Sequence, residues 1–533
     1  MNTLYKFFSI AIFGIFLSAC GTNATPAQDT YQNLQSPNNN NNNNNNQSTL
    51  ANEIIFIQSA DPPSLDPQNN NDTVSSEATS QMFERLTTIN EYGNAVGQLA
   101  EYFHTIDDYT WEFILRSGVY FHDGTYFNSY AVKVTLDRLL DEENASVRAF
   151  MLNVISEVVI IDDYTVHIIT EAPFGPLPTH LAHHAGKMIS PYAIALELNG
   201  GPTIAENPIG TGPFKLLSRS HGAEVRFTRF ENYWGVPAAT QYLTFVVVPE
   251  PATRLAMLES GGGHITNIQP QDVGILQNTP GIEVIQTPIN RMEYLGFNTM
   301  VYPFDNQLVR QALTMAVNKE DILYGIADGM GTIAHTAIAP GVFASPTLDQ
   351  LTVKEFNMDM ARQLLAEAGY PDGFETTLLI GYGNTVRQLT AEYLQASFAQ
   401  IGVSVEIQLM EWGAFLDTID AGEHEMYLLG WTTGTGDPDH SIWPLYHSST
   451  HGPFGNTVFH TNPIVDELLE KGRSTLDLNL REQIYLEISQ ILIDTAARVY
   501  LFHPFQQMGV SSSVGGFFIE NGTPRFHLTY IIE

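Results

Sequence analysis

The sequence predicts an α/β protein built from at least two lobes. Two observations support this fold class: the chain has 533 residues, and strand-like and helix-like segments alternate in its second half. Single hydrophobic cores stop growing near about 250–300 residues, so a chain of this length divides into more than one folded unit. Strand–helix–strand alternation is typical of a parallel α/β sheet. A hydrophobic fraction of 44% and an aromatic fraction of 11% indicate a folded protein.

The first element is a predicted secretion signal over residues 1–19. Lys6 supplies the positive start, and the apolar run Phe7–Leu17 is shorter than the about 20 residues that a membrane-spanning helix needs. Leu17-Ser18-Ala19-Cys20 ends the run at the single cysteine of the chain. This tetrapeptide resembles the bacterial lipobox, in which the cysteine is lipidated and becomes the mature N-terminus. We expect Cys20 to carry a lipid anchor; an ordinary secretory signal with a stray thiol is the alternative.

Residues 20–50 are expected to form the lipidated cysteine and a disordered tether. The segment is rich in Asn, Gln, Thr, Ser and Pro, with nine consecutive asparagines over Asn38–Asn46. A segment with so little apolar surface to bury stays disordered. Next to a lipid anchor, it is best explained as a spacer between the membrane and the folded body.

The first half of the body contains several predicted strands. Ile54–Ile57 is a short apolar run that suits a buried strand. Glu157–Thr170 reads as a hairpin that turns at Asp162–Asp163, and Tyr242–Val248 is another buried strand candidate. No internal repeat accompanies these segments.

The second half has the clearer pattern. Apolar residues recur at helical spacing over Leu308–Val317, after two plausible capping residues at Asp305 and Asn306. The elements that follow in order are a strand over Thr376–Tyr382, a helix over Val386–Ile401, a strand over Val403–Met410, a helix over Trp412–Ile419, a strand over Met426–Trp431, a helix that starts at Asn462-Pro463 and a helix over Arg481–Ala496.

Charge and motif content exclude several classes of function. A formal net charge of −35 argues against general affinity for nucleic acid or acidic lipid surfaces. The sequence has no Gly-x-Ser-x-Gly elbow, no His-Glu-x-x-His pair, no P-loop and no cysteine placed as a nucleophile. We therefore expect a binding protein without catalytic residues and without a cofactor.

Nine segments, in order, resemble the extracellular solute-binding proteins of family 5, which serve ABC importers for oligopeptides, dipeptides, nickel complexes and related solutes. They are Ser64–Pro67, Leu115–Arg138, Asn207–Lys215, Glu231–Gly235 (ENYWG), Tyr294–Thr299 (YLGFNT), Pro303–Val317, Ala361–Gly373, Gly430–Asp439 (GWTTGTGDPD) and Arg481–Asp494. Each segment alone is a weak signal, whereas nine in the expected order behind a lipobox are specific. The resemblance covers nearly the whole body.

The resemblance implies a two-lobed, periplasmic-binding-protein-like (Venus flytrap) α/β fold with an extra subdomain in lobe I. The ligand is enclosed between lobes joined by a hinge. The implied boundaries are 51–85, 209–288 and 504–533 for the parts of lobe I, 86–208 for the extra subdomain and 289–503 for lobe II.

The resemblance also points to one strand end as a ligand wall. Leu428–Gly434 is a strand that ends in glycines, which suits main-chain pairing with an extended peptide, and it contains Gly430 and Thr433. In resembling proteins the tryptophan at the position of Trp431 lines the pocket; simple core packing is the alternative.

One position departs from the family pattern. Dipeptide and oligopeptide binders carry an aspartate three residues after that tryptophan, where it holds the peptide's amino terminus, but this chain has Gly434. Recognition of a free amino terminus is therefore in doubt. Asp437 or Asp439 is a candidate replacement, or either one caps a helix that begins near His440.

Two arginines and one tyrosine complete the candidate ligand residues. Arg291 and Arg387 are each able to clamp a carboxylate through a bidentate pair, or to form a surface or interlobe salt bridge instead. Tyr294, on the segment entering lobe II, is expected to form an aromatic wall.

Several histidines raise the question of a metal site. His180, His183 and His184 have helical spacing, so His180 and His184 would share one helix face as zinc ligands do. No glutamate accompanies them in a His-Glu-x-x-His arrangement, and no thiol is available. We therefore expect no metal site.

The sequence thus predicts a monomeric, lipid-anchored binding protein on the outer side of the cell membrane. It would capture an oligopeptide or dipeptide and deliver it to an ABC permease, with no nucleic acid partner. Open alternatives are a nickel or haem complex, glutathione or an oligosaccharide as ligand, or a peptide-sensing role for the same fold.

Overall fold

One mixed sheet of 12 strands runs through the computed structural model, which describes residues 52–70, 72–452 and 455–532. The strand order is β16-β15-β17-β13-β18-β11-β1-β10-β9-β8, and β12 and β14 also pair with β18. These strands are β1 (Glu53–Gln58), β8 (Phe214–Ser220), β9 (Glu224–Arg229), β10 (Tyr242–Val247), β11 (Ile265–Asn267), β12 (Ile282–Pro288), β13 (Arg291–Phe297), β14 (Gly331–Ile333), β15 (Glu375–Gly381), β16 (Ser404–Met410), β17 (Met426–Thr432) and β18 (Arg498–Ser511). We call the part that carries β1 and β8–β11 lobe I and the part that carries β13 and β15–β17 lobe II.

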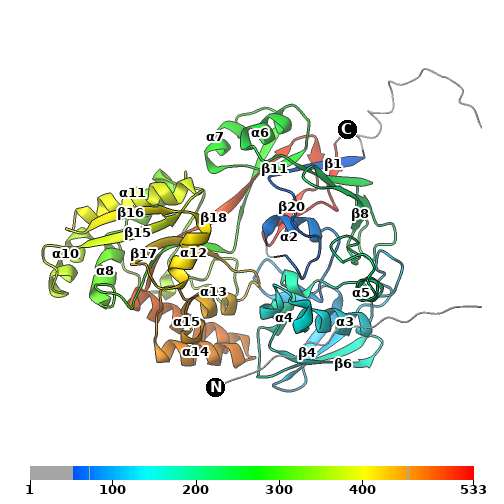
Figure 1. The fold of residues 1–533 in the computed structure, drawn as a ribbon, viewed down its shortest axis with the longest axis horizontal. Helices are drawn as coiled ribbons and strands as arrows, with labels where there is room; N and C mark the ends of the chain where they lie inside the picture. The colour runs from blue at the N-terminus through cyan, green and yellow to red at the C-terminus, as the bar shows by residue number, and fades with distance from the viewer. Residues whose placement is uncertain (1–51, 71, 453–454, 533) are drawn as a thin grey trace, which may run out of the picture. The chain divides into compact units, whose positions relative to one another are not determined.

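Strand β18 belongs to both lobes. Its first residues, Arg498–Phe502, pair with β13, whereas Phe505–Ser511 pair with β12. Figure 1 shows β18 passing between the strands of lobe II and β11. The chain crosses a second time between β12 and β13, which are separated by Ile289 and Asn290 alone. Two adjacent extended segments therefore connect the lobes, which is the arrangement that a hinge needs.

Lobe I is built on the strand predicted over Ile54–Ile57. Strand β1 pairs in parallel with β10 and β11, and β10 continues in antiparallel fashion to β9 and β8. Phe56 and Phe245 lie on neighbouring strands with ring centroids 4.9 Å apart, and Phe526 packs against both. The C-terminal segment thus closes the core of lobe I.

A separate sheet of four strands, in the order β4-β5-β7-β6, lies in the segment predicted to be the extra subdomain of lobe I. The hairpin predicted over Glu157–Thr170 is present as β6 and β7, which pair in antiparallel register. The remaining strands outside the large sheet are β2 (Thr87–Ile89), β3 (Ala95–Gly97), β4 (Ala100–Thr105), β5 (Thr110–Leu115), β6 (Ile155–Asp162), β7 (Thr165–Thr170), β19 (Val514–Gly515), β20 (Phe518–Glu520), β21 (Thr523–Arg525) and β22 (Tyr530–Ile531).

Fourteen helices surround these sheets in the described residues. They are α2 (Thr73–Thr79), α3 (Ser129–Leu140), α4 (Leu177–Leu181), α5 (Pro191–Leu198), α6 (Pro251–Glu259), α7 (Val273–Leu276), α8 (Gln307–Met315), α9 (Lys319–Gly325), α10 (Met358–Glu367), α11 (Thr385–Ala399), α12 (Trp412–Asp420), α13 (Pro438–Tyr446), α14 (Pro463–Ser474) and α15 (Leu478–Thr495). None of the described helices has the length and apolarity to cross a membrane.

Local signals set where the lobe II helices begin. Asn306 caps α8 by accepting from Leu308 N, and Asn462 caps α14, whose first residue is proline. Helix α15 starts three residues earlier than predicted because Asp477 accepts from the amides of Asn479 and Leu480.

The sheet of lobe II is mixed, whereas the sequence predicted a parallel one. Strand β15 pairs in parallel with both β16 and β17, as predicted, but β13 is antiparallel to β17 and to β18. The reason is the double crossing: β13 leaves lobe I and β18 returns to it through the same connection, so the two strands run in opposite directions.

The signal peptide (1–19) and the tether with its lipidated cysteine (20–50) lie outside the described residues. The lobe and subdomain boundaries stay predictions.

Candidate functional site

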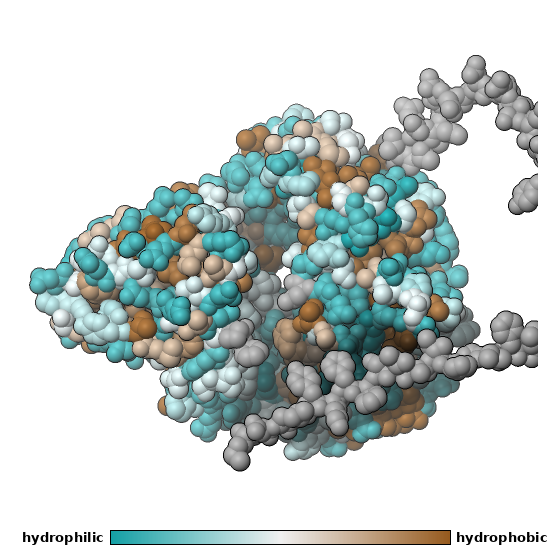
Figure 2. Space-filling view, viewed as in Figure 1, coloured by the Kyte–Doolittle hydropathy of each residue, from teal (hydrophilic) through white to brown (hydrophobic). Residues whose placement is uncertain are grey.

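A cavity of about 1060 Å³ lies between the lobes. Figure 2 shows a hollow between the side of the molecule that carries α8 and α10 and the side that carries α3–α5. Lobe I and its subdomain contribute Asp72, Thr73, Ser76, Glu77, Arg85, Ile89, Arg148, Phe150, Met151, Asn153, His180, Ala182, His183, His184, Asn267, Ile268 and Glu520–Thr523. The crossing segments contribute Ile289, Asn290, Arg291, Gln506 and Gln507. Lobe II contributes Trp431–Gly434, Gly436, Asp439, His440, Trp443, Pro444, Ser449, Thr450 and Arg473.

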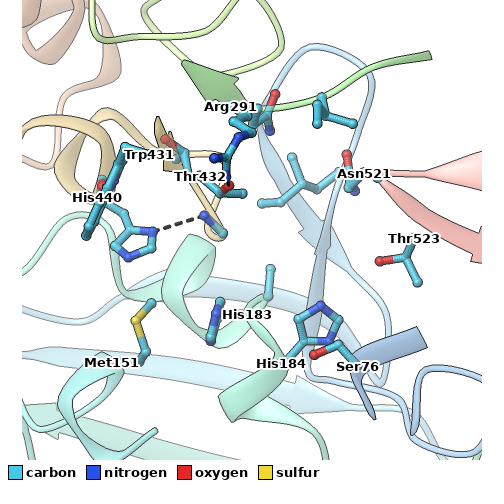
Figure 3. Close-up of a pocket in the computed structure, with 18 of the residues that line it drawn as sticks. Ser76, Met151, His183, His184, Arg291, Trp431, Thr432, His440, Asn521 and Thr523 are labelled. Atoms are coloured by element: carbon cyan, nitrogen blue, oxygen red, sulfur yellow. Dashed lines mark hydrogen bonds between the residues drawn. The ribbon is translucent and has the colours of Figure 1, made fainter. Parts of the chain in front are cut away.

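The end of β17 forms the lobe II wall (Figure 3). Trp431 lines the cavity, and its Nε1 donates to His440 O at 2.8 Å, which fixes the plane of the indole. Thr433 N donates to Asn290 O at 2.7 Å, and Gly434 N donates to His440 Nδ1 at 3.0 Å. Of the residues expected on this wall, Trp431, Thr433 and Gly434 line the cavity and Gly430 does not.

Gly430 has a structural role next to a buried glutamate. It lies opposite Glu293 on β13, and a Cβ at this position would lie 2.4 Å from Glu293 Oε1. Glu293 accepts from Arg291 Nε and from Arg387 Nε, each at 2.8 Å. Burial acts to raise the pKa of Glu293, but the charges of Arg291 and Arg387 outweigh it and hold the pKa below its ordinary value.

The two candidate carboxylate clamps differ in position. Arg291 lines the cavity and also donates to Thr432 Oγ1 at 3.0 Å. Arg387 lies in the first turn of α11 and is buried. Its guanidinium donates hydrogen bonds to Glu293, and it does not line the cavity. Of the two alternatives expected for Arg387, a carboxylate clamp or a salt bridge, the structure has the salt bridge, with Glu293 of the same lobe.

Tyr294 does not line the cavity either. Its side chain is buried, with its ring centroid 5.8 Å from that of Tyr427 and 5.0 Å from the guanidinium of Arg498. Tyr294 lies further along β13 from the crossing segment than Arg291 does, and its ring packs into the core of lobe II. The expected aromatic wall at this position is corrected.

Both aspartates considered as replacements for a missing acid are paired with arginines. Asp437 caps α13 and accepts from Arg481 through both oxygens, at 2.8 and 2.9 Å. Asp439 lines the cavity and accepts from Arg473 Nε and Nη2 at 2.9 and 3.0 Å. Burial acts to raise the pKa of Asp439, but the charge of Arg473 and contact with His180 keep it well below the ordinary value.

The same pair connects the lobes at one edge of the cavity. His180 Nε2 of lobe I lies 3.2 Å from Asp439 Oδ2, and Gly175 N donates to Arg473 O at 2.9 Å. The guanidinium of Arg473 lies 3.6 Å from the ring of Trp443 and 5.5 Å from the ring of Phe174. The lobes are thus in contact across the cavity.

The polar lining is rich in groups that both donate and accept hydrogen bonds. Six carboxamide side chains lie on it: Asn153, Asn267, Asn290, Gln506, Gln507 and Asn521. A carboxamide has the same donor and acceptor as a peptide group, so this lining matches a solute made of amides.

Residues 94–453 match the family model described as "Bacterial extracellular solute-binding proteins, family 5 Middle". This stretch covers more than half of the chain and includes Trp431, Gly434 and His440 of the cavity wall. The chain belongs to family 5.

Family 5 relatives resemble the chain over most of its length. The glutathione-binding protein GsiB of Salmonella typhimurium is 31% identical over 452 residues, which is 83% of this chain and 87% of the relative. The structure of HbpA2 from Haemophilus parasuis has a TM-score of 0.82 and 29% identity, over 90% of this chain and all of that one. A dipeptide-binding protein from Pseudoalteromonas sp. SM9913, solved with Met-Leu, has a TM-score of 0.76 and 27% identity, with the same coverage.

The family fixes the general function and fold. This chain is an extracytoplasmic solute-binding protein of an ABC importer, with the mixed α/β fold of periplasmic binding proteins, and it is not an enzyme. The fold class and family predicted from the sequence are confirmed.

The histidines are arranged differently from the helical spacing in the sequence. Helix α4 ends at Leu181, and His183 caps the following short turn, so His180 and His184 do not share a helix face. Within the described residues no group of three or more His, Cys, Asp or Glu side chains is placed to hold a metal ion.

Two cavity residues, Arg148 and Glu77, were missed by sequence reasoning. Arg148 is 2% exposed and donates to Asn70 Oδ1 at 2.9 Å and Ser76 Oγ at 3.0 Å. Glu77 is buried beside it on α2, and burial raises the pKa of its carboxyl to about 8. No local pattern marks either residue, because the partners of Arg148 lie more than 70 positions away along the chain.

Proposed function

We propose that this family 5 protein captures a short peptide-like solute, glutathione or a small peptide, between its lobes and delivers it to a membrane permease. The carboxamide-rich lining of the interlobe cavity carries the proposal, because it offers paired donors and acceptors to the amide groups of such a solute. Names of the relatives agree with this choice: one is called glutathione-binding, and another was solved with a dipeptide.

The size of the cavity supports a small solute. Its volume of about 1060 Å³ lies just above the roughly 300–1,000 Å³ typical of small-molecule sites. Lobes in contact at His180–Asp439 and Gly175–Arg473 close one edge, which disfavours a long chain that extends out of the cavity there.

Trp431 is the proposed aromatic platform for the solute, with Thr433, Gly434 and Arg291 around it. The indole is half-buried and held in place by its bond to His440 O, so it presents a fixed apolar face. Strand β17 pairs with β15 through Met426 and Tyr427. Beyond Tyr427, main-chain groups on this edge of β17 are available to pair with the main chain of a bound peptide.

Cys20 is proposed to anchor the protein to the outer face of the membrane, with residues 21–50 as the spacer. A tethered receptor stays near its permease partner, which raises the effective concentration of the partner. The protein is proposed to act as a monomer.

Isothermal titration of the purified full-length protein tests the proposal. The titrants are reduced glutathione, a dipeptide, a tripeptide and a nonapeptide. We expect one-to-one binding of glutathione or of the di- or tripeptide, and weaker or no binding of the nonapeptide. Trp431→Ala should weaken the binding about tenfold. Trp412→Ala is the control, because Trp412 is 44% exposed on α12 and does not line the cavity. Absence of heat with every titrant would reject the proposal.

A further inference from the structure

Two hydrogen-bond donors face each other without an acceptor at one corner of the cavity. His183 Nδ1 accepts from the amide of Ala185 at 3.2 Å, so the hydrogen of the neutral imidazole is on Nε2. Arg148 Nη1 lies 3.4 Å from that Nε2. Since both atoms then carry hydrogens, this contact is not a hydrogen bond, and the two N–H groups have an oxygen acceptor as their natural partner.

The neutral state of His183 follows from its surroundings. Its side chain is 8% exposed, and burial, followed by the charge of Arg148, holds the pKa of the imidazole well below the ordinary value. A doubly protonated ring is further excluded by the Ala185 amide, which needs a lone pair on Nδ1. Figure 3 shows His183 on the wall between His440 and His184.

Arg148 has neutral partners. Its other guanidinium nitrogens donate to Asn70 O, Asn70 Oδ1 and Ser76 Oγ. Among the described residues, none forms a salt bridge with Arg148, which is 2% exposed, and Asp72 is the acid whose charge acts on it. A buried guanidinium without a directly paired carboxylate is costly, and an anion from the solute offsets that cost.

The acidic groups around this corner do not supply the missing acceptor for Arg148 and His183. Asp439 is committed to Arg473, and Asp72 caps α2 by accepting from Ser75 N at 2.7 Å. The pKa of Glu77, raised by burial to about 8, leaves that side chain mostly protonated at neutral pH. On the other side, Arg85 adds positive charge. Lys187 Nζ donates to the hydroxyls of Thr79 and Ser80, and burial with the nearby arginines holds the pKa of its amine well below the ordinary value.

We propose that Arg148 and His183 bind a carboxylate of the captured solute, through Nη1–H of the arginine and Nε2–H of the histidine. This deepens the function proposed above and rests on it. The opposite wall agrees: His440 Nδ1 accepts from Gly434 N, so its Nε2 is also a donor when the ring is neutral. Gly434 leaves the space for this corner, since a Cβ there would lie 2.8 Å from His183 Cδ2.

Glutathione carries two carboxylates, which makes it a suitable probe. Two analogues each remove one of them: 4-aminobutanoyl-Cys-Gly lacks the glutamyl α-carboxylate, and γ-Glu-Cys-glycinamide lacks the glycine carboxylate. Each is titrated into the wild type and into Arg148→Gln. We expect Arg148→Gln to weaken glutathione binding about tenfold or more. One analogue, the one that lacks the bound carboxylate, should bind the wild type with about tenfold lower affinity than glutathione. For Arg148→Gln, the affinities of that analogue and of glutathione should be equal.

Arg254→Gln is the matched control for removing a buried arginine. Arg254 is 4% exposed, donates to the backbone oxygens of Val248 and Pro249, and does not line the cavity. Its variant should bind glutathione like the wild type. His183→Ala is the second variant, which leaves the bonds of Arg148 to Asn70 and Ser76 in place and should lose affinity several-fold.

The outcomes separate this inference from the proposed function. If Arg148→Gln binds glutathione normally, or weakens both analogues as much as glutathione, the carboxylate site is wrong while peptide capture stands. If glutathione and both analogues fail to bind the wild type, glutathione is wrong as the solute. Sodium glutarate at matched ionic strength then tests whether Arg148 and His183 bind a carboxylate. A rise in Tm with glutarate that Arg148→Gln abolishes supports the site, and no rise rejects it.

Discussion

Gly434 of lobe II and His183 of lobe I face each other so closely that a Cβ on Gly434 would lie 2.8 Å from Cδ2 and 3.0 Å from Nε2 of the imidazole. This contact is made only when the lobes are together, and it lies at the proposed carboxylate corner. The identity of residue 434 therefore bears on closure as well as on the charge of the solute.

Gly434→Ala should weaken solute binding several-fold, because the added methyl group displaces His183 or holds the lobes apart. Isothermal titration with glutathione or a tripeptide measures the loss. Gly274→Ala on α7 is the control, since a Cβ there meets no atom within 4 Å. Wild-type affinity in Gly434→Ala would show that the two walls do not approach each other in the bound state.

Arg473→Gln should destabilise the protein by about 2–3 kcal/mol. Asp439, with a side chain that is 1% exposed, would lose its main counter-charge and keep only the contact with His180. Chemical denaturation at pH 7 measures the change. Arg362→Gln, which removes an exposed pair with Asp359, should change stability by less than about 0.5 kcal/mol. Equal effects of the two variants would contradict the buried role of Asp439.

Elements with a strong local period were predictable from the sequence. The strand and helix predicted over Val403–Met410 and Trp412–Ile419 match β16 and α12 within one residue at each end. Alternation of apolar residues along a strand and the 3.6-residue period along a helix carry that information locally. The long strand β18 was not predicted, because Pro504, Gln506 and Gln507 interrupt its apolar pattern where its pairing passes from one lobe to the other.

The site was only partly predictable for a physical reason. The family resemblance gave the position of Trp431 but not the packing of Tyr294, whose ring the core of lobe II encloses. Arg148 could not be predicted as a site residue from the sequence, because its role depends on Asn70, Ser76 and His183, which only the tertiary fold brings beside it.

Glu77→Gln should stabilise the protein increasingly as the pH rises from about 4.5 to about 8. Burial raises the pKa of this carboxyl from 4.5 to about 8, so the folded state favours the protonated form. The cost of ionising it is absent below pH 4.5, grows through this window and levels off above it. Melting temperatures of the variant and the wild type at pH 4.5, 6 and 8 measure the difference. Glu91→Gln, at an exposed position, should show no such trend.

Cys20→Ser should move the protein from the membrane fraction to the soluble extracytoplasmic fraction, because one hydroxyl replaces the thiol that receives the lipid. Immunoblots of fractionated cells measure the distribution. A neighbouring substitution in the spacer, Asn40→Ser, should leave the protein in the membrane fraction. Retention of Cys20→Ser on the membrane would contradict a lipid anchor at this cysteine.

Small-angle X-ray scattering of the full-length protein, with and without a saturating solute identified by titration, tests most directly whether the lobes form a clamp around their cargo. We predict that the radius of gyration falls when the solute is added, and that Trp431→Ala requires more solute for the same change. An identical scattering curve before and after saturation would contradict closure on a solute held between β17 and the wall that carries Arg148 and His183.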